Sequence, residues 1–429
     1  MIELAEIFRQ YGPAYRAKFG ERLLPSHRQA MWAIEHCRTA ALGGQVYHCP
    51  DCEQDVYQYH SCRNRHCPKC QNEQAQRWLE QQWAMLLPVP YFMLTFTLPA
   101  ALRPLARQQQ RLIYDRLFRA SAAATQHLAD DPRFIGGQLG LVGVLHTWGR
   151  TLTYHPHVHY LIPAGGWVAD TQTWRAARDD FLVPVKALSG IFRARLRDAL
   201  RPTAVFDQIP AQVWTTDWVV HCQAVGTGET AFKYLAPYVF RVALSNRRLV
   251  KVEDQRVTFR YRATDTGQPK LCTLAVEEFI HRFLQHVLPA GFVKVRYYGF
   301  LSAGQRPQLA LIRQTLGAAP HAPVAPGEPL VADLPPAQSD APHIDDQPVA
   351  TCSDAVPSAA PPPDDSPAEA AAASPNASVG LSPVLPDTGR RCPQCGRLMT
   401  RRPLPRPGPN RLPGGCGPPD IHHPVANQC

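Results

Sequence analysis

The chain has 429 residues, of which 45% are hydrophobic, and a formal net charge of +10 at neutral pH. This length suits two or three domains. The charge is uneven, because residues 319–389 contain ten Asp or Glu and no Lys or Arg, which leaves about +20 on the rest of the chain. An excess of this size favours a polyanionic partner, and nucleic acid is the one we expect.

Two protein classes are disfavoured by what the sequence lacks. It contains no run of eighteen or more apolar residues, and the opening MIELAE has no cationic stretch followed by an apolar one. We therefore expect a soluble, unsecreted protein without a membrane partner. It also lacks a Gly-rich phosphate loop ending in Lys and Ser or Thr, so we expect no nucleotide cofactor.

The first 42 residues are predicted to form two helices. Leu4, Ile7 and Phe8 stand at helical spacing, and Pro25 and Ser26 divide the segment. Basic side chains decorate both predicted helices, either as a solvated face or as one that faces DNA.

Residues 43–75 carry two CxxC pairs. Cys49 and Cys52 are followed, after fourteen residues, by Cys67 and Cys70. In a reducing compartment this spacing is typical of a four-cysteine zinc site that closes a small ribbon. We therefore predict structural Zn²⁺ on these four thiolates.

Further polar residues lie between and beside these pairs. His60, Cys62 and His66 are treated as spare ligands, because a second metal would strain so short a loop. The zinc-stapled loop also carries three cations that we expect to contact DNA phosphates: Arg63, Arg65 and Lys69.

The middle of the chain alternates between strand and helix patterns. Strands are predicted over 90–99, 139–148, 152–163, 214–225 and 291–301, helices over 72–85, 101–129, 185–200 and 277–287, and a hairpin over 249–274 with its turn at 266–267. Strands with hairpin-like neighbours, separated by helices, predict an α+β fold with an antiparallel sheet and helices on one face.

One predicted strand carries a histidine cluster. Side chains alternate along a strand, so His155, His157 and His159 would all lie on one face, as metal ligands do. Histidines on a solvated face or within a core are the alternative. A zinc hydrolase is disfavoured, because the Asp of a His-x-His-x-Asp-His arrangement is missing.

A pair of tyrosines follows downstream. Tyr234 and Tyr238 are four residues apart, which on a helix places both phenols on one face, although Pro237 weakens that helix. A phenol can attack phosphorus when a divalent cation polarises the phosphate. Aromatic core residues are the alternative. Nearby cations predicted to contact DNA are Arg241, Arg247 and Arg248.

Beyond residue 317 the composition changes to Pro, Ala, Asp and Ser. We predict a disordered linker over 318–390, because such a sequence cannot bury enough apolar surface to fold. Residues 391–429 contain a third CxxC, Cys392 and Cys395, and a basic tail. Since only Cys416, His422, His423 and Cys429 follow as partner ligands, a second zinc knuckle there is left open.

Together these motifs resemble a known group of enzymes. His157-Val158-His159 followed by Tyr234-x-x-x-Tyr238 looks like the two-tyrosine form of the HUH endonuclease superfamily. The runs VLHTWG before the histidines, YLAPYVFRVALSNRR around the tyrosines and CRNRHCPKCQ in the cysteine segment are similar to rolling-circle transposases of the insertion sequence 91 family. The resemblance extends from about residue 20 to about residue 310.

This resemblance implies a ferredoxin-like HUH core over residues 81–317, after a helical and zinc-binding domain over 1–80, with the histidine strand central in the sheet. His157 and His159 would hold Mg²⁺ or Mn²⁺, with His155 or His146 as third ligand. Tyr234 or Tyr238 would then attack single-stranded or hairpin DNA at element ends and form a 5′-phosphotyrosine link. A cytoplasmic, nucleoid-associated bacterial transposase is the expectation.

Other functions remain open. A transposase-derived DNA-binding protein without catalysis is one, and a plasmid-type replication initiator with the same nicking chemistry is another. A metal-dependent hydrolase of small molecules is disfavoured by the basic charge.

Overall fold

The computed structural model describes residues 2–70, 82, 85–178, 180–227, 243–263, 266–317 and 389–407. The chain divides into two compact units. The larger comprises Met1–Glu35 and Arg63–Asp365, and the smaller comprises His36–Cys62 and Ser366–Cys429. Several predicted features lie outside the described residues, namely Tyr234, Tyr238, Arg241, most of the helix expected over 72–85 and residues 318–388 of the predicted linker.

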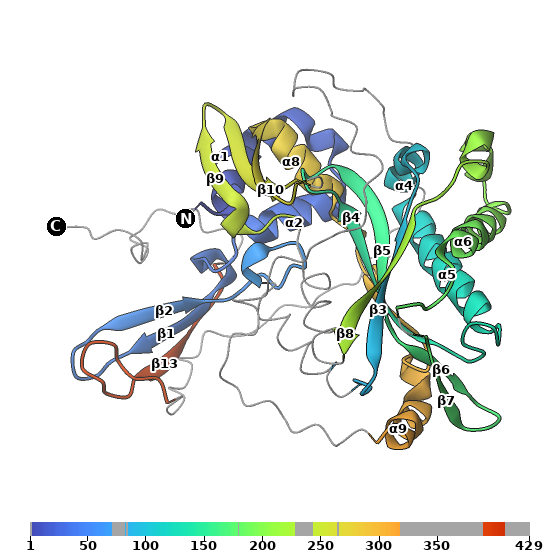
Figure 1. Cartoon of the computed structure of the whole chain (residues 1–429). Helices are drawn as coiled ribbons and strands as arrows, with labels where there is room; N and C mark the ends of the chain where they lie inside the picture. The colour runs from blue at the N-terminus through green and yellow to red at the C-terminus, as the bar shows by residue number, and fades with distance from the viewer. Residues whose placement is uncertain are drawn as a thin grey trace, which may run out of the picture. The chain divides into compact units, whose positions relative to one another are not determined.

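A five-stranded antiparallel sheet organises the larger unit (Figure 1). Its spatial order is β12-β4-β5-β3-β8, so the histidine strand β5 lies in the middle. The strands are β3 (Pro90–Thr97), β4 (Gly140–Trp148), β5 (Tyr154–Pro163), β8 (Val220–Thr227) and β12 (Val295–Gly299). Four of these predicted strands are confirmed closely or in part, whereas the strand expected from residue 214 begins later because residues 211–214 form a 3₁₀ turn.

Helices α5 (Gln110–Ala129) and α6 (Val185–Leu200) cover one face of this sheet (Figure 1). The Phe96 ring of β3 lies 4.9 Å from Phe192 of α6 and 5.9 Å from Tyr160 of β5. The single helix predicted over 101–129 is wrong in its continuity. A shorter helix, α4 (Arg103–Gln108), stops at Gln109, whose backbone (φ −116°, ψ 50°) is not helical.

The opposite face of the sheet has its own apolar layer. Tyr91, Met93 and Leu161 pack there with Phe300 and with helix α9 (Arg306–Thr315). A separate two-stranded hairpin, β6 (Gly165–Val168) and β7 (Thr173–Ala176), follows β5 in the chain.

The two predicted N-terminal helices are confirmed as α1 (Leu4–Phe19) and α2 (Pro25–Glu35), both in the larger unit. Phe8 of α1 contacts Phe283 of α8 (Val276–Gln285) with ring centroids 5.4 Å apart. These helices are predominantly amphipathic, and this contact buries their apolar sides.

The hairpin predicted over 249–274 is part of a three-stranded sheet, β11-β10-β9. Its strands are β9 (Leu249–Glu253), β10 (Arg256–Arg262) and β11 (Pro269–Ala275). The additional turn uses Asp254 and Gln255, whose φ angles are 48° and 56°. Sequence reasoning missed it because such turns usually contain Gly or Asn.

The smaller unit is a three-stranded antiparallel sheet with the order β13-β1-β2. β1 (Gly44–His48) and β2 (Asp55–Tyr59) form a hairpin, and β13 (Thr400–Leu404) pairs with β1 from His48↔Thr400 to Gly44↔Leu404. Segments far apart in the sequence thus build one sheet.

Within the described part of the chain, every helix is too short or too polar to span a lipid bilayer.

Packing between β5 and α5 can be tested at Gly143. A Cβ atom there would lie 2.5 Å from Cε1 of Tyr160 and 3.1 Å from Cε1 of Phe118. We expect Gly143→Ala to lower the free energy of unfolding by about 1–3 kcal/mol through overpacking. Gly190→Ala in α6 is the matched control, since its Cβ would meet nothing within 4 Å and should stabilise the helix by roughly 1 kcal/mol. Denaturant unfolding of both variants measures this, and equal effects would contradict the packing.

Candidate functional site

Three histidines from two neighbouring strands form a compact group. His146 on β4 pairs directly with His157 on β5, and His159 lies two residues further along the same face. One ring nitrogen of each histidine lies within 4.8 Å of those of the other two. The rings themselves are 4.7–5.4 Å apart. This is the spacing of a three-ligand metal centre.

The sequence left His146 and His155 open as the third ligand. The structure brings His146 together with His157 and His159, while the ring of His155 lies 5.4 Å from that of His157 and outside the group. His146 lies on a different strand from His157 and His159, so sequence spacing does not place it beside them. The register between β4 and β5 does.

Hydrogen bonds orient two of the three rings. Nδ1 of His157 donates to the backbone carbonyl of His155 at 2.7 Å, and Nδ1 of His159 contacts Oγ1 of Thr95 at 2.9 Å. A bond at Nδ1 leaves Nε2 to face a metal. Sequence analysis missed Thr95, although a threonine within the apolar run Met93–Phe96 was a usable signal.

The group occupies the sheet face opposite α5 and α6. Thr95 and Thr97 of β3 pair with His159 and His157, so all four side chains lie on the face away from Phe96. His146 and His159 are only 3% and 6% exposed. A metal held here would be largely shielded from solvent.

Aromatic and basic side chains border the group. Trp148 stacks on His146 at 4.6 Å, and the ammonium of Lys294 lies 5.2 Å from the centre of the Trp148 ring. Burial, together with the positive charge of Arg65, lowers the pKa of Lys294 to about 7. Burial therefore disfavours the charged form of Lys294 relative to an exposed lysine.

The donor set suits a transition metal. Neutral imidazole nitrogen binds first-row transition-metal ions, whereas Mg²⁺ prefers oxygen ligands. Of the two ions predicted from the sequence, Mn²⁺ fits the three histidines better.

Four cysteines form a second candidate metal site, within the smaller unit. The sulfur atoms of Cys49, Cys52, Cys392 and Cys395 lie within 4.8 Å of one another, with 3.4 Å between Cys49 and Cys395 and 3.5 Å between Cys52 and Cys392. Zn–S bonds of about 2.3 Å in a tetrahedron place sulfurs about 3.8 Å apart. Backbone N–H groups of Cys395 and Gln394 lower the pKa of Cys392 to about 6. The geometry and the chemistry both suit structural zinc.

The partners of Cys49 and Cys52 differ from those predicted. The sequence favoured Cys67 and Cys70, and the structure supplies Cys392 and Cys395. Residues 68–70 form a helical turn in which the Cys70 N–H bonds the Cys67 carbonyl at 3.1 Å. The CxxC motifs at Cys49 and at Cys67 therefore have different backbone conformations, although their cysteine spacing is the same.

The chain matches known protein families over the whole histidine site and over part of the cysteine site. Residues 140–308 match a family model described as "Putative transposase", and residues 7–98 match one described as "Transposase zinc-binding domain". The "Putative transposase y4qJ" of Sinorhizobium fredii is 42% identical over 342 residues, which span 75% of this chain and 86% of that relative. The chain belongs to the insertion sequence 91 family of transposases.

A second relative supports the same assignment. The "Transposase for insertion sequence element IS801" of Pseudomonas savastanoi pv. phaseolicola is 29% identical over 289 residues, which span 62% of this chain and 68% of that relative. No solved structure matches this transposase significantly. The first family model includes His146, His157 and His159, and the second includes Cys49 and Cys52 but ends well before Cys392.

The predicted DNA contacts on the cysteine loop of this transposase have different surroundings. Arg63 is exposed. Arg65 donates to the carbonyl of Phe292 at 2.6 Å, and the Lys69 ammonium lies 2.5 Å from the Glu3 carboxylate. Arg65 is exposed as well, so Arg63 and Arg65 differ in their hydrogen-bond partners and not in burial class, whereas Lys69 is half-buried.

The two described arginines after the tyrosine segment also differ. Arg247 is exposed. Arg248 donates to the carbonyls of Arg260 at 2.8 Å and Arg150 at 2.7 Å, and its guanidinium lies over the Phe259 ring at 5.5 Å. These bonds give Arg248 a structural role in joining two segments.

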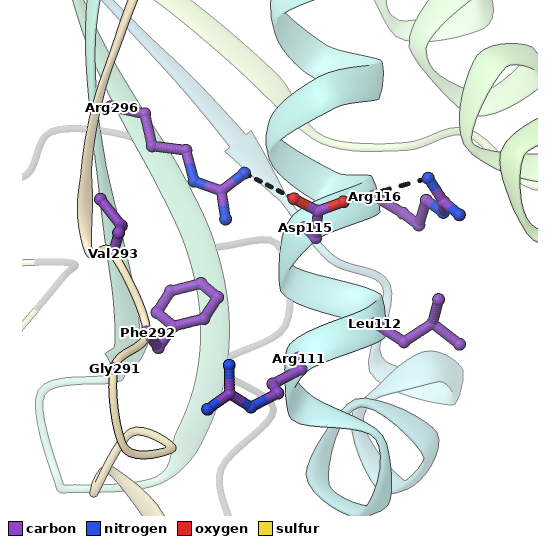
Figure 2. Close-up of a pocket in the computed structure, with 8 residues that line it drawn as sticks. All are labelled: Arg111, Leu112, Asp115, Arg116, Gly291, Phe292, Val293 and Arg296. Carbon is purple, nitrogen blue, oxygen red and sulfur yellow. Dashed lines mark hydrogen bonds and ion pairs between the residues drawn. The ribbon is translucent and has the colours of Figure 1, made fainter.

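A basic pocket of about 580 Å³ lies between α5 and the segment before β12 (Figure 2). Its lining residues are Arg111, Leu112, Asp115, Arg116, Gly291, Phe292, Val293 and Arg296. Asp115 pairs with Arg296 at 2.8 Å, and the pocket lining contains this one carboxylate and three guanidinium groups. The sequence indicated an Arg-rich helix and a basic aromatic strand, but not that they share a pocket.

The orienting bond to His159 is testable. We expect Thr95→Val to weaken Mn²⁺ binding by about 10–100-fold, because His159 loses the partner that fixes its ring. Thr97→Val, two residues along the same strand, is the matched control and should bind Mn²⁺ as the unaltered protein does. Titration calorimetry on both variants measures the affinity, and an unchanged affinity in Thr95→Val would contradict the role of this bond.

Proposed function

We propose that this transposase nicks and rejoins single-stranded DNA at the ends of its element through a covalent 5′-phosphotyrosine intermediate, as in rolling-circle transposition. The observation that carries this proposal is the group of His146, His157 and His159 on the central sheet of a transposase. Three buried imidazoles on one face suit a metal centre for phosphoryl transfer, and the family provides the DNA substrate.

The reaction exchanges one phosphate ester bond for another, so the number of ester bonds does not change. The phenolic oxygen of Tyr234 or Tyr238 attacks the scissile phosphorus, the bond from phosphorus to the 3′ oxygen breaks, and that oxygen leaves as a 3′ hydroxyl after taking up a proton. Attack of a 3′ hydroxyl on the phosphotyrosine reverses the step and joins strands. No nucleoside triphosphate is consumed, because the bond energy of the broken DNA ester is conserved in the phosphotyrosine ester between protein and DNA.

The described residues have distinct parts in this proposal. His146, His157 and His159 would hold Mn²⁺ or Mg²⁺, and the ion would supply positive charge to stabilise the negative charge that develops during phosphoryl transfer. Thr95 and the His155 carbonyl fix two of the rings. With β5 central in an antiparallel sheet and the two long helices α5 and α6 on one face, we assign this core to the ferredoxin-like HUH fold.

Single-stranded or hairpin DNA is the proposed substrate. The basic pocket offers Arg111, Arg116 and Arg296 to phosphates. Helix α5, which lines the pocket, also contacts the histidine strand, because the hydroxyl of Tyr114 in α5 hydrogen-bonds that of Tyr154 at the start of β5.

Structural zinc is the second proposed cofactor. The matched zinc-binding range 7–98 contains six cysteines, of which Cys49 and Cys52 belong to the group with Cys392 and Cys395. We propose Cys67 and Cys70, the other CxxC pair of this range, as ligands of further zinc.

The decisive assay uses an oligonucleotide that carries the element end and a label at its 3′ terminus. A 5′-phosphotyrosine link retains the 3′ fragment, so incubation with Mn²⁺ should yield a labelled protein band on a denaturing gel. We expect His157→Ala to reduce the adduct at least 100-fold, and Tyr234→Phe or Tyr238→Phe to abolish it or to leave one of two cleavage events.

Two controls make the assay specific. Tyr261→Phe, on β10, should form the adduct normally, and a 5′-labelled oligonucleotide should release a shorter free strand. A metal-independent adduct would contradict the role of the histidines. DNA binding without any adduct would instead favour a DNA-binding protein that has lost catalysis.

A further inference from the structure

We infer that residues 389–407 are the second half of a zinc ribbon whose first half is residues 44–59, and that one Zn²⁺ on Cys49, Cys52, Cys392 and Cys395 holds the two halves together. The matched zinc-binding range ends at residue 98, so it does not include Cys392 or Cys395. This inference concerns the smaller unit and is independent of the proposed nicking chemistry.

The two CxxC segments have the same backbone conformation. The Cys49 N–H bonds the Gln54 carbonyl at 2.9 Å, and the Cys392 N–H bonds the Arg397 carbonyl at 2.7 Å, five residues on in each case. The residue after the second cysteine is left-handed in both, with φ 53° at Glu53 and 74° at Gly396. Two matching turns, facing each other, present two pairs of thiols to one point.

The sulfur atoms complete this symmetry. Cys49 approaches Cys395 at 3.4 Å, and Cys52 approaches Cys392 at 3.5 Å, so each pair contributes to both contacts. These separations suit a shared tetrahedral ion, as shown above. Four thiols this close lose protons readily to a soft cation, because the metal replaces those protons and binds the thiolates.

Strand pairing and packing support the same assembly. β13 extends the β1–β2 hairpin into a three-stranded sheet along its whole length. A small core of Tyr47, Cys49, Cys392 and Met399 lies beneath the site, with Met399 only 1% exposed. So small an apolar core is not sufficient to stabilise this sheet without a further cross-link such as a structural metal ion.

Charge also matches between the two halves. Residues 36–62 contain one arginine and three acidic residues, whereas residues 389–407 contain six arginines and no acidic residue. Arg397 pairs with Asp51 at 2.7 Å, which joins the two matching turns. Arg390 lies over the Tyr47 ring at 4.7 Å. The late segment therefore brings most of the positive charge of the ribbon.

The inference can be tested by cutting the chain between the two halves. A recognition sequence for a specific protease, inserted between Ala350 and Thr351 of the full-length protein, allows cleavage after folding. We expect both fragments to elute together in size-exclusion chromatography with zinc bound, and to separate when a strong zinc chelator is added. Fragments that remain together after complete zinc removal, or separate with zinc still bound, would overturn the inference.

Zinc stoichiometry by mass spectrometry distinguishes one shared site from two separate ones. Cys49→Ser/Cys52→Ser and Cys392→Ser/Cys395→Ser should each lose one zinc per chain, and the fourfold variant should lose no more than one. Loss of two zinc ions in the fourfold variant would overturn the inference. Circular dichroism checks that the helices of each variant are intact, and Cys392→His should retain the zinc at lower affinity.

The matched control changes the two cysteines that follow Cys395 in the sequence. Cys416→Ser/Cys429→Ser should keep the full zinc content and the association of the cleaved fragments. If this variant loses zinc as Cys392→Ser/Cys395→Ser does, the late CxxC forms a self-contained knuckle with residues 416–429 and the inference is wrong.

Discussion

The register between β4 and β5 is the constraint on which the histidine site depends. Because side chains alternate along a strand, a shift of one residue would turn His146 toward α5 and away from His157 and His159. The register is fixed by burial on the other face, where Tyr160 packs between Phe96 and Phe118. Gly143, opposite Tyr160, leaves space for that ring. An apolar core thus positions polar ligands on the face it does not use.

The cysteine site brings together two segments that are about 340 residues apart in the sequence, one with Cys49 and Cys52 and one with Cys392 and Cys395. Loop-closure entropy grows only with the logarithm of length, so closing such a gap costs about 3 kcal/mol more than closing a 15-residue loop. Structural zinc on thiolates contributes about 10–16 kcal/mol in small peptides. Sequence separation is therefore no obstacle to a zinc ribbon split between β1–β2 and β13, provided that the matching turns can meet.

Much of the larger unit could be predicted from the sequence, because its patterns are local. The bounds of α6 and of the central strands follow from the spacing of apolar residues and from the Pro and Gly residues that end these elements. The pairing of distant segments could not be predicted. His146 and Thr95 join the site through strand neighbours, and Cys392 joins Cys49 through β13. CxxC spacing alone does not distinguish the turn at Cys49 from the helical turn at Cys67, because backbone conformation decides where the thiols point.

The most direct test of the account is to count the nitrogen ligands of the metal by pulsed electron paramagnetic resonance on the full-length protein loaded with Mn²⁺. We expect three histidine nitrogens coupled to the ion in the unaltered protein, two in His146→Ala, and still three in His155→Ala. A signal from oxygen ligands alone, or a coupling that disappears in His155→Ala but persists unchanged in His146→Ala, would contradict the site described here.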